Sequence, residues 1–170
     1  MTRPAAPPAT TAAPRRSDAM VEHLVETTLD VFATMIARPL QSAPPTYNTA
    51  QPGAAVVATV GFTGSLKGLV VVRCSKAAGL EITAAMLGLE PDAVVADVPD
   101  AMGEVANMVA GGFRTKMSSG DDRWEITMPV VTSGEQFTIT YSTDTFRVVC
   151  PFTMGSHDIF VELVVQPDQR

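Results

Sequence analysis

Two periods in the apolar and polar positions along the chain predict where its helices and strands lie. Between residues 17 and 38, apolar side chains recur every three or four positions, the period of an amphipathic helix. Its apolar stripe consists of Met20, Val21, Leu24, Val25, Leu29, Phe32, Met35 and Ile36. Ser17 is placed to cap this helix, and Pro39 ends it. Further helices are expected over 76–87, between Ser75 and Gly88, and over 99–117.

Six other segments are rich in β-branched residues or alternate in polarity, which is typical of strands. They cover about 54–62, 66–73, 124–131, 135–141, 145–150 and 158–165. The first two are joined across 63–65 as a hairpin, and LVVVRC in the second is apolar on both faces, which favours a central strand. The segment 158–165 fits either an edge or a central strand. Alternation puts Trp124, Ile126, Met128 and Val130 on one face, and Phe137, Ile139 and Tyr141 inward.

The order of these elements is α-β-β-α-α-β-β-β-β, and hairpin connections require antiparallel pairing. We therefore expect an α+β fold in which about three helices pack on a mostly antiparallel sheet of about six strands. Residues 1–16 are rich in proline and alanine and hold no large apolar side chain beyond Met1, so they are interpreted as a disordered tail. Residues 17–166 then form one domain.

Composition narrows the function classes. The net charge is −6, with scattered lysines and arginines, which argues against nucleic-acid binding. No apolar run approaches the roughly 20 residues that span a bilayer, and no secretory signal begins the chain, so we expect no membrane insertion and a cytoplasmic location. Cys74 and Cys150 are interpreted as buried thiols. His23 and His157 lack partners at metal-ligand spacing, so no metal site of its own is expected.

The third expected helix has an unusual polar side. Residues three or four apart share a helix face, so one stripe carries Asp100, Glu104, Asn107, Gly111 and Arg114, with Gly103 beside it. Glu104 and Asn107 project together, and the glycines lower the relief around them. The same pattern also describes an ordinary solvated face, with Asp100 favoured by the helix dipole and the glycines used for packing.

A resemblance to a known family favours a functional face over an ordinary solvated one. Asp100, Glu104 and Asn107 are followed by Pro129 on the next strand, an arrangement that resembles the D/S-x3-E-x2-N-x22-P signature of the CheC/CheX/FliY family of chemotaxis phosphatases. The last interval is 21 residues here, one shorter than in that signature. Residues 24–37 are also similar to the first helix of CheX-type domains, and the resemblance covers about residues 17–166.

The resemblance implies an activity. Family members dephosphorylate the aspartyl phosphate of a response-regulator receiver domain, CheY in chemotaxis, within two-component signalling. By this likeness Asn107 orients the attacking water, and Glu104 pairs with the receiver's active-site lysine. Asp100, Gly103, Gly111 and Arg114 would contact the receiver, and Pro129 would be structural. The Mg²⁺ would belong to the receiver, and the chain itself would need no cofactor.

The first helix supplies an internal comparison. Asp18 and Glu22 repeat the spacing, but Val25 stands where a second asparagine would be needed. One active edge is therefore expected, as in CheX-type members, which are homodimers that join sheets through edge strands. Two alternatives stay open. The chain could be a non-catalytic receiver-binding or flagellar-switch-type interaction module, or a structural dimer that buries the Glu104–Asn107 face against its own copy.

Overall fold

A computed structural model of the 170-residue chain describes residues 14–48, 53–118, 123–141 and 145–166. Residues 1–13 of the predicted tail lie outside the described residues. The last three residues of that tail belong to the first helix, which begins at Pro14 rather than at Ser17. Proline is well tolerated in the first turn of a helix, because the N–H group that it lacks would have no intrahelical partner there.

The three long helices correspond to the three that the sequence predicts. They are α1 (Pro14–Val31), α2 (Lys76–Leu87) and α3 (Val98–Met117). A π-helical turn, η1 (Phe32–Ile36), continues α1, and a 3₁₀ turn, η2 (Pro91–Ala93), lies between α2 and α3. The hydroxyl of Ser75 accepts a hydrogen bond from the amide of Ala78, and Gly88 ends α2 with φ of 65°, so both predicted caps of α2 are confirmed.

Within the described residues, eight antiparallel strands form one sheet. They are β1 (Gln41–Ser42), β2 (Thr46–Tyr47), β3 (Ala54–Thr63), β4 (Lys67–Cys74), β5 (Glu125–Ile126), β6 (Val130–Phe137), β7 (Phe146–Met154) and β8 (His157–Val165). The order is β1-β7-β8-β4-β3-β5, with β2 also paired to β7 and β6 also paired to β3. The predicted α+β class is confirmed, and β8 is a central strand.

The strand count exceeds the predicted six for two local reasons. β1 and β2 have two residues each and lie in the proline-rich segment, where no apolar alternation marks a strand. The segment predicted as one strand over 124–131 is instead divided between β5 and the start of β6. The predicted strand 135–141 contributes to the sheet only as far as Phe137.

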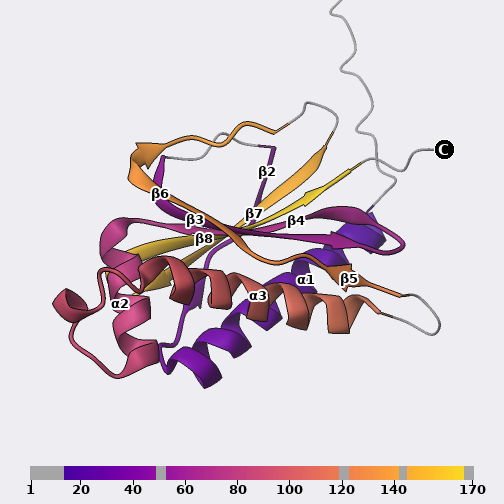
Figure 1. The fold of residues 1–170 in the computed structure, drawn as a ribbon. Helices are drawn as coiled ribbons and strands as arrows, with labels where there is room; N and C mark the ends of the chain where they lie inside the picture. Colours follow the sequence, from indigo (N-terminus) through magenta and orange to yellow (C-terminus); the bar gives the residue numbers. More distant parts are fainter. Residues whose placement is uncertain (1–13, 49–52, 119–122, 142–144, 167–170) are drawn as a thin grey trace, which may run out of the picture.

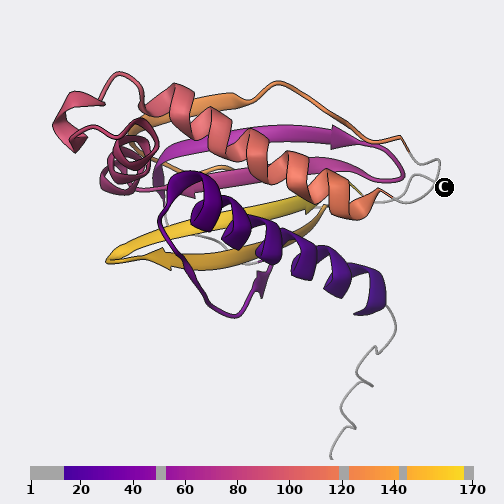
Figure 2. The ribbon, with the colours of Figure 1, turned by 90° about the horizontal axis from the view of Figure 1, so that it is seen from below.

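All three long helices cover one face of the sheet, and α1 and α3 run side by side across it (Figure 1, Figure 2). Between these layers lies the main core, which includes Phe32, Val70, Val105, Phe113 and Leu163. Alternate residues of β4 point to opposite faces: Val70, Val72 and Cys74 join this core, and Val71 joins a smaller cluster on the other face. The prediction of a central, doubly buried strand is therefore confirmed.

Close contact between α1 and α3 fixes the position of the polar stripe. A Cβ atom added at Gly112 would lie 2.5 Å from the Cγ2 atom of Thr27, so only glycine allows this approach of the two helices. Nearby, Lys116 Nζ and Glu26 Oε2 form an exposed ion pair at 2.7 Å. Both contacts hold the second half of α3 against α1.

The stretch between β5 and β6 departs from the predicted alternation. Thr127 donates its amide to the carbonyl of Gly61, and its hydroxyl oxygen accepts from the amide of Gly61, both at 2.9 Å. The regular ladder stops there and restarts at Val130. Trp124 is buried and Ile126 packs on the core, but Met128 is 86% exposed and Val130 is 66% exposed. The prediction that these four residues share one face was therefore wrong for Met128 and Val130.

The sheet face away from the helices buries an ionic cluster. Glu162 is fully buried between two arginines, with Oε1 2.7 Å from Nε of Arg73 and Oε2 2.8 Å from Nε of Arg147. The first contact lies outside hydrogen-bond geometry and is an ion pair, and Nη2 of Arg73 has no hydrogen-bond partner among the described residues. Burial is the main cause that lowers the pKa of Arg73, which is 3% exposed. Phe137, Ile139 and Tyr141 pack over this face beside Val57 and Val71.

Candidate active site

The polar stripe predicted on the third helix lies on α3, a 20-residue helix that packs against α1, α2 and β3. Pro99 occupies the first turn, where its missing amide removes no helical hydrogen bond. Met102, Val105, Val109 and Phe113, which lie on the opposite side of the helix from this stripe, are buried. The sequence therefore set the rotation of this helix correctly.

Glu104 and Asn107 lie on the side of α3 that is turned away from the core. Glu104 is exposed and Asn107 is half-buried. Neither side chain has a hydrogen bond or ion pair with the part of the chain that is described. Helix geometry separates them by about 4.5 Å along the axis and about 60° around it. The carboxylate of Glu104 and the amide of Asn107 are thus both available to bind the same site on a partner protein.

Gly103 differs in its role from the prediction. It is buried, and an added Cβ atom would lie 3.3 Å from Cγ2 of Val131 and 3.5 Å from Cγ of Pro129. The space that glycine leaves is therefore taken by this chain's own β5–β6 segment rather than left open for a partner. Pro129 itself lies in the break between β5 and β6, as expected for a residue that lacks an amide donor.

The remaining residues of the stripe stay accessible. Asp100 is exposed in the first turn of α3, where a carboxylate interacts favourably with the helix dipole. Nothing would lie within 4 Å of a Cβ atom at Gly111, so this position is open to solvent. Arg114 is half-buried in the last turn. Together with Glu104 and Asn107, these three residues extend the accessible face over about 21 Å of helix.

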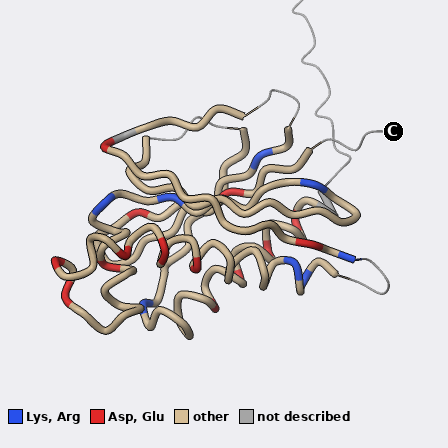
Figure 3. Tube along the Cα trace, viewed as in Figure 1, with Lys and Arg blue, Asp and Glu red and all other residues tan. Residues whose placement is uncertain are grey.

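Charge along α3 follows its direction. Asp100 lies in the first turn and Arg114 and Lys116 in the last, the order that the helix dipole favours. Figure 3 shows the same division, with acidic positions along the first half of the helix and basic positions at its end. Lys116 is engaged by Glu26, which leaves Arg114 as the cation of the stripe. A partner that binds Glu104 would present positive charge to the first half of α3.

The described part of the chain offers no metal centre at this face. No three His, Cys, Asp or Glu side chains in that part gather closely enough to hold a metal ion. None of its helices is long and apolar enough to cross a membrane. Cys74 and Cys150 are both buried and unpaired, and burial raises the pKa of each thiol to about 12. The thiols are therefore core residues and not nucleophiles.

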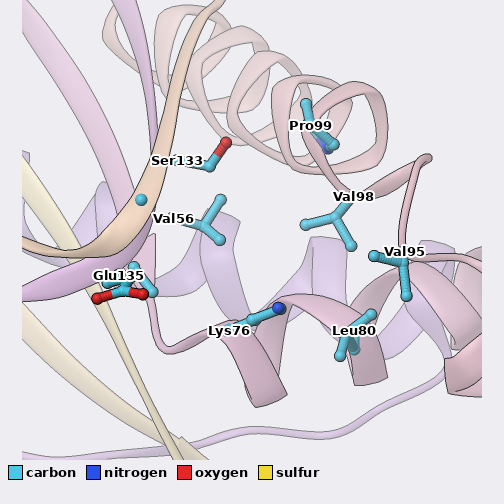
Figure 4. A pocket seen from close by; sticks show the side chains of 10 residues that line it. Val56, Lys76, Leu80, Val95, Val98, Pro99, Ser133 and Glu135 are labelled. Atoms are coloured by element: carbon cyan, nitrogen blue, oxygen red, sulfur yellow. The ribbon is translucent and has the colours of Figure 1, made fainter.

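A cavity of about 590 Å³ opens at the beginning of α3. Val56, Leu80, Val95 and Val98 form its apolar wall, with Lys76 and Glu135 among the polar residues that line it (Figure 4). Pro99, the residue before Asp100, is among the residues that line the cavity. The cavity borders the accessible stripe but includes neither Glu104 nor Asn107.

Comparison with known proteins assigns the family. The sequence profile described as "Chemotaxis phosphatase CheX" matches residues 56–153, which is more than half of the chain and includes all of α3. The chain belongs to the CheX family. The match spans Asp100, Glu104, Asn107 and Pro129, the four signature positions named in the sequence analysis, whereas residues 24–37 lie outside it.

Relatives of the CheX family share both sequence and fold with this chain. The CheY-P phosphatase CheX of Thermotoga maritima is 28% identical over 123 residues, covering 72% of this chain and 77% of that protein. The chemotaxis protein CheX of Desulfovibrio desulfuricans has a TM-score of 0.77 and 27% identity, over 86% of this chain and 99% of that one. CheX in a CheX–CheY–BeF₃–Mg²⁺ complex from Borrelia burgdorferi has a TM-score of 0.75 and 20% identity, over 87% and 98%.

The residues of α1 do not repeat the Glu104–Asn107 pair of α3. Val25, which stands where a second asparagine would be needed, is half-buried and packs against the main core. Reasoning from the sequence missed Val131 as the partner of Gly103, and Gly112 as the glycine that brings α1 and α3 together. The adjacent pair Gly111-Gly112 was a signal for the second contact, because one of two neighbouring helix positions must face the neighbouring helix.

Proposed function

We propose that this chain hydrolyses the aspartyl phosphate of a CheY-like receiver domain. One observation carries the proposal: Asn107 lies on the accessible side of α3, one turn from Glu104, and neither side chain is engaged by the described part of the chain. The relative named a CheY-P phosphatase in Thermotoga maritima supports the choice of substrate. The CheX–CheY complex of Borrelia burgdorferi supports a receiver as the partner.

Asn107 is the catalytic residue of this proposal. An acyl phosphate is already reactive, so positioning of the water provides most of the required acceleration. A carboxamide is neutral and both donates and accepts hydrogen bonds, which allows it to hold a water molecule in line with the leaving oxygen. The water oxygen bonds to phosphorus as the bond from phosphorus to the aspartyl oxygen breaks. Both water protons leave with the inorganic phosphate, and the aspartate carboxylate is regenerated on the receiver.

Glu104 docks the helix on the receiver. Its exposed carboxylate pairs with the lysine of the receiver's active site and so aims Asn107 at the phosphoryl group. A charge-assisted hydrogen bond of this type contributes about 1.5–3 kcal/mol when it is desolvated at an interface. Mg²⁺ held by the receiver would neutralise phosphoryl charge, and this proposal assigns no described residue of this chain as its ligand. Asp100, Gly111 and Arg114 form the surrounding contact area.

The test is the lifetime of the phosphoryl group on purified CheY-like receiver domains. Receivers from the same organism are phosphorylated with phosphoramidate, and phosphate release is followed with and without this chain. The proposal predicts faster release from at least one receiver with the wild type and no acceleration with Asn107→Ala. A receiver that binds tightly while its phosphate lifetime stays unchanged would favour the non-catalytic interaction module instead.

A further inference from the structure

The cavity at the beginning of α3 has a mixed lining. Its apolar wall includes Leu80, Val98 and Val95, and Val95 is 53% exposed in a space of about 590 Å³. Lys76 and Glu135 add charged groups to the same lining. Sites for drug-sized ligands have volumes of about 300–1,000 Å³ and combine apolar walls with a few polar groups. The cavity therefore has the size and composition of a small-molecule site.

Core packing and backbone hydrogen bonds hold the walls of the cavity in place. Val56 and Val98 line the cavity and also belong to the main core. In the connection from α2 to α3, Val94 is fully buried, and its carbonyl accepts a hydrogen bond from the amide of Asp97 at 3.0 Å. On the other side, Ser133 of β6 is in antiparallel register with Val56 of β3. Because the walls are formed in advance, little entropy is lost when a ligand enters.

Two opposite charges line the cavity without neutralising each other. Lys76, in the first turn of α2, and Glu135, on β6, are both exposed, and neither forms an ion pair with a described residue. In the view of Figure 4, the amino group of Lys76 lies between Leu80 and the carboxylate of Glu135. A ligand with a single negative charge would be attracted by Lys76 and repelled by Glu135. A ligand that carries both charges can pair with both residues.

We propose that the cavity binds a zwitterionic ligand with an apolar body, of the class of short apolar peptides with free ends. At pH 7 such a peptide carries one carboxylate and one ammonium group. Lys76 binds the carboxylate, Glu135 binds the ammonium group, and the side chains of the peptide pack on the apolar wall. A single amino acid is smaller than the ligands that cavities of this volume enclose, so a dipeptide fits better. This binding does not depend on the proposed function, because the cavity includes neither Glu104 nor Asn107.

The experiment titrates the full chain with leucyl-leucine as the probe and measures its Kd by calorimetry. The wild type is expected to bind with a Kd of about 1 mM or lower. Lys76→Met removes the charge at similar length and should raise Kd about fivefold, the effect of a charged contact that stays partly exposed. Lys67→Met is the matched control. Lys67 is exposed at the start of β4 and does not line the cavity, so this change should leave Kd unchanged.

Capped probes assign each charge of the ligand to its partner. Leucyl-leucinamide lacks the carboxylate, so the wild type should bind it about fivefold more weakly than leucyl-leucine, and Lys76→Met should cause no further loss. Acetyl-leucyl-leucine lacks the ammonium group and should give the same result with Glu135→Gln. If the wild type binds capped and free peptides equally, or if neither variant weakens the binding of leucyl-leucine, the proposed ligand class is wrong.

Amide NMR spectra of the ¹⁵N-labelled chain locate the probe. Leucyl-leucine should shift the amides of residues that line the cavity, such as Val95, Val98 and Ser133. Shifts confined to other parts of the chain, or no binding at about 10 mM, would overturn the inference. If a receiver domain shifts these amides and the dipeptide does not, the cavity accommodates a side chain of a protein partner and the inference is wrong. The lifetime of the receiver's phosphoryl group is measured separately, so either proposal can fail while the other stands.

Discussion

Pro129 lies against α3 at Gly103: a Cβ atom added to Gly103 would be 3.5 Å from the Cγ atom of Pro129. This contact explains why a proline more than 20 positions after Asn107 belongs to the same sequence pattern. The proline and Val131 fix the edge of the sheet on the helix, one residue from Glu104. The shorter interval to Pro129 in this chain is compatible with that contact, because the β5–β6 break absorbs irregular spacing.

Substitutions at two glycines of α3 test this contact. Gly103→Val places methyl groups against Pro129 and Val131 and is expected to lower the free energy of unfolding by about 1–3 kcal/mol, the usual effect of overpacking. Gly111→Ala meets open space and should raise it by about 0.5–1 kcal/mol through better helix propensity. Urea denaturation measures both. Equal effects at the two positions would contradict the difference in their surroundings.

Glu104 is predicted to control affinity rather than chemistry. Glu104→Gln removes the charge at nearly constant volume and should raise KM for the phosphorylated receiver by about 10- to 100-fold, the equivalent of about 1.5–3 kcal/mol. The wild-type KM should also rise with added salt, and that dependence should weaken in the variant. Glu22→Gln is the matched control, because Glu22 is the exposed residue at the corresponding position of α1. A loss confined to kcat would assign Glu104 a different role.

The buried cluster around Glu162 is predicted to be sensitive to loss of one charge. Glu162→Gln removes the carboxylate that pairs with Arg73 and Arg147, in a site where Arg73 is 3% exposed and Glu162 is fully buried. The free energy of unfolding should fall by about 3–5 kcal/mol. Glu125→Gln, at an exposed position of β5, should change it by less than about 0.5 kcal/mol. Comparable values for the two variants in urea denaturation would contradict the account of the cluster.

The buried thiols predict a loss of stability in alkaline solution. Burial raises the pKa of Cys74 and of Cys150 from 9.0 to about 12, so the unfolded chain releases these protons first. Because the folded state then binds more protons, the free energy of unfolding is unaffected below pH 9 and falls between pH 9 and about 12. The slope is at most about 1.4 kcal/mol per pH unit for each thiol.

Tyr141 adds to this slope in the same direction, since burial raises its pKa from 10.0 to about 12. Urea denaturation at a series of pH values from 8 to 10.5 measures the total. The double variant Cys74→Ala, Cys150→Ala should have lower stability at pH 8 and a flatter decline above pH 9. A decline as steep as in the wild type would show that other groups cause it.

Strong periodicity made most of the fold predictable from the sequence. The apolar stripe of α3 fixed its rotation, and Ser75 and Gly88 fixed both ends of α2, because each signal is local. β1 and β2 have only two residues each and no apolar pattern, and their pairing with β7 depends on contacts about 100 residues away in the chain. Such strands leave no local signal.

The site was predictable in its residues but not in its surroundings. Helix periodicity placed Glu104, Asn107 and Gly111 on one accessible face. The burial of Gly103 depends on Pro129 and Val131, and the exposure of Met128 depends on the hydrogen bonds between Thr127 and Gly61. These contacts join β3, α3 and the β5–β6 segment, so a pattern read within one element does not contain them.

The rate of phosphoryl hydrolysis at saturating concentration is the measurement closest to the central claim. Asn107→Ala removes the group proposed to orient the attacking water and is a small change at a half-buried position. With a receiver that the wild type dephosphorylates, kcat should fall by about 10²–10³, while the circular dichroism spectrum and receiver binding remain those of the wild type. A variant that binds the receiver and releases phosphate as fast as the wild type would contradict the proposed role of Asn107.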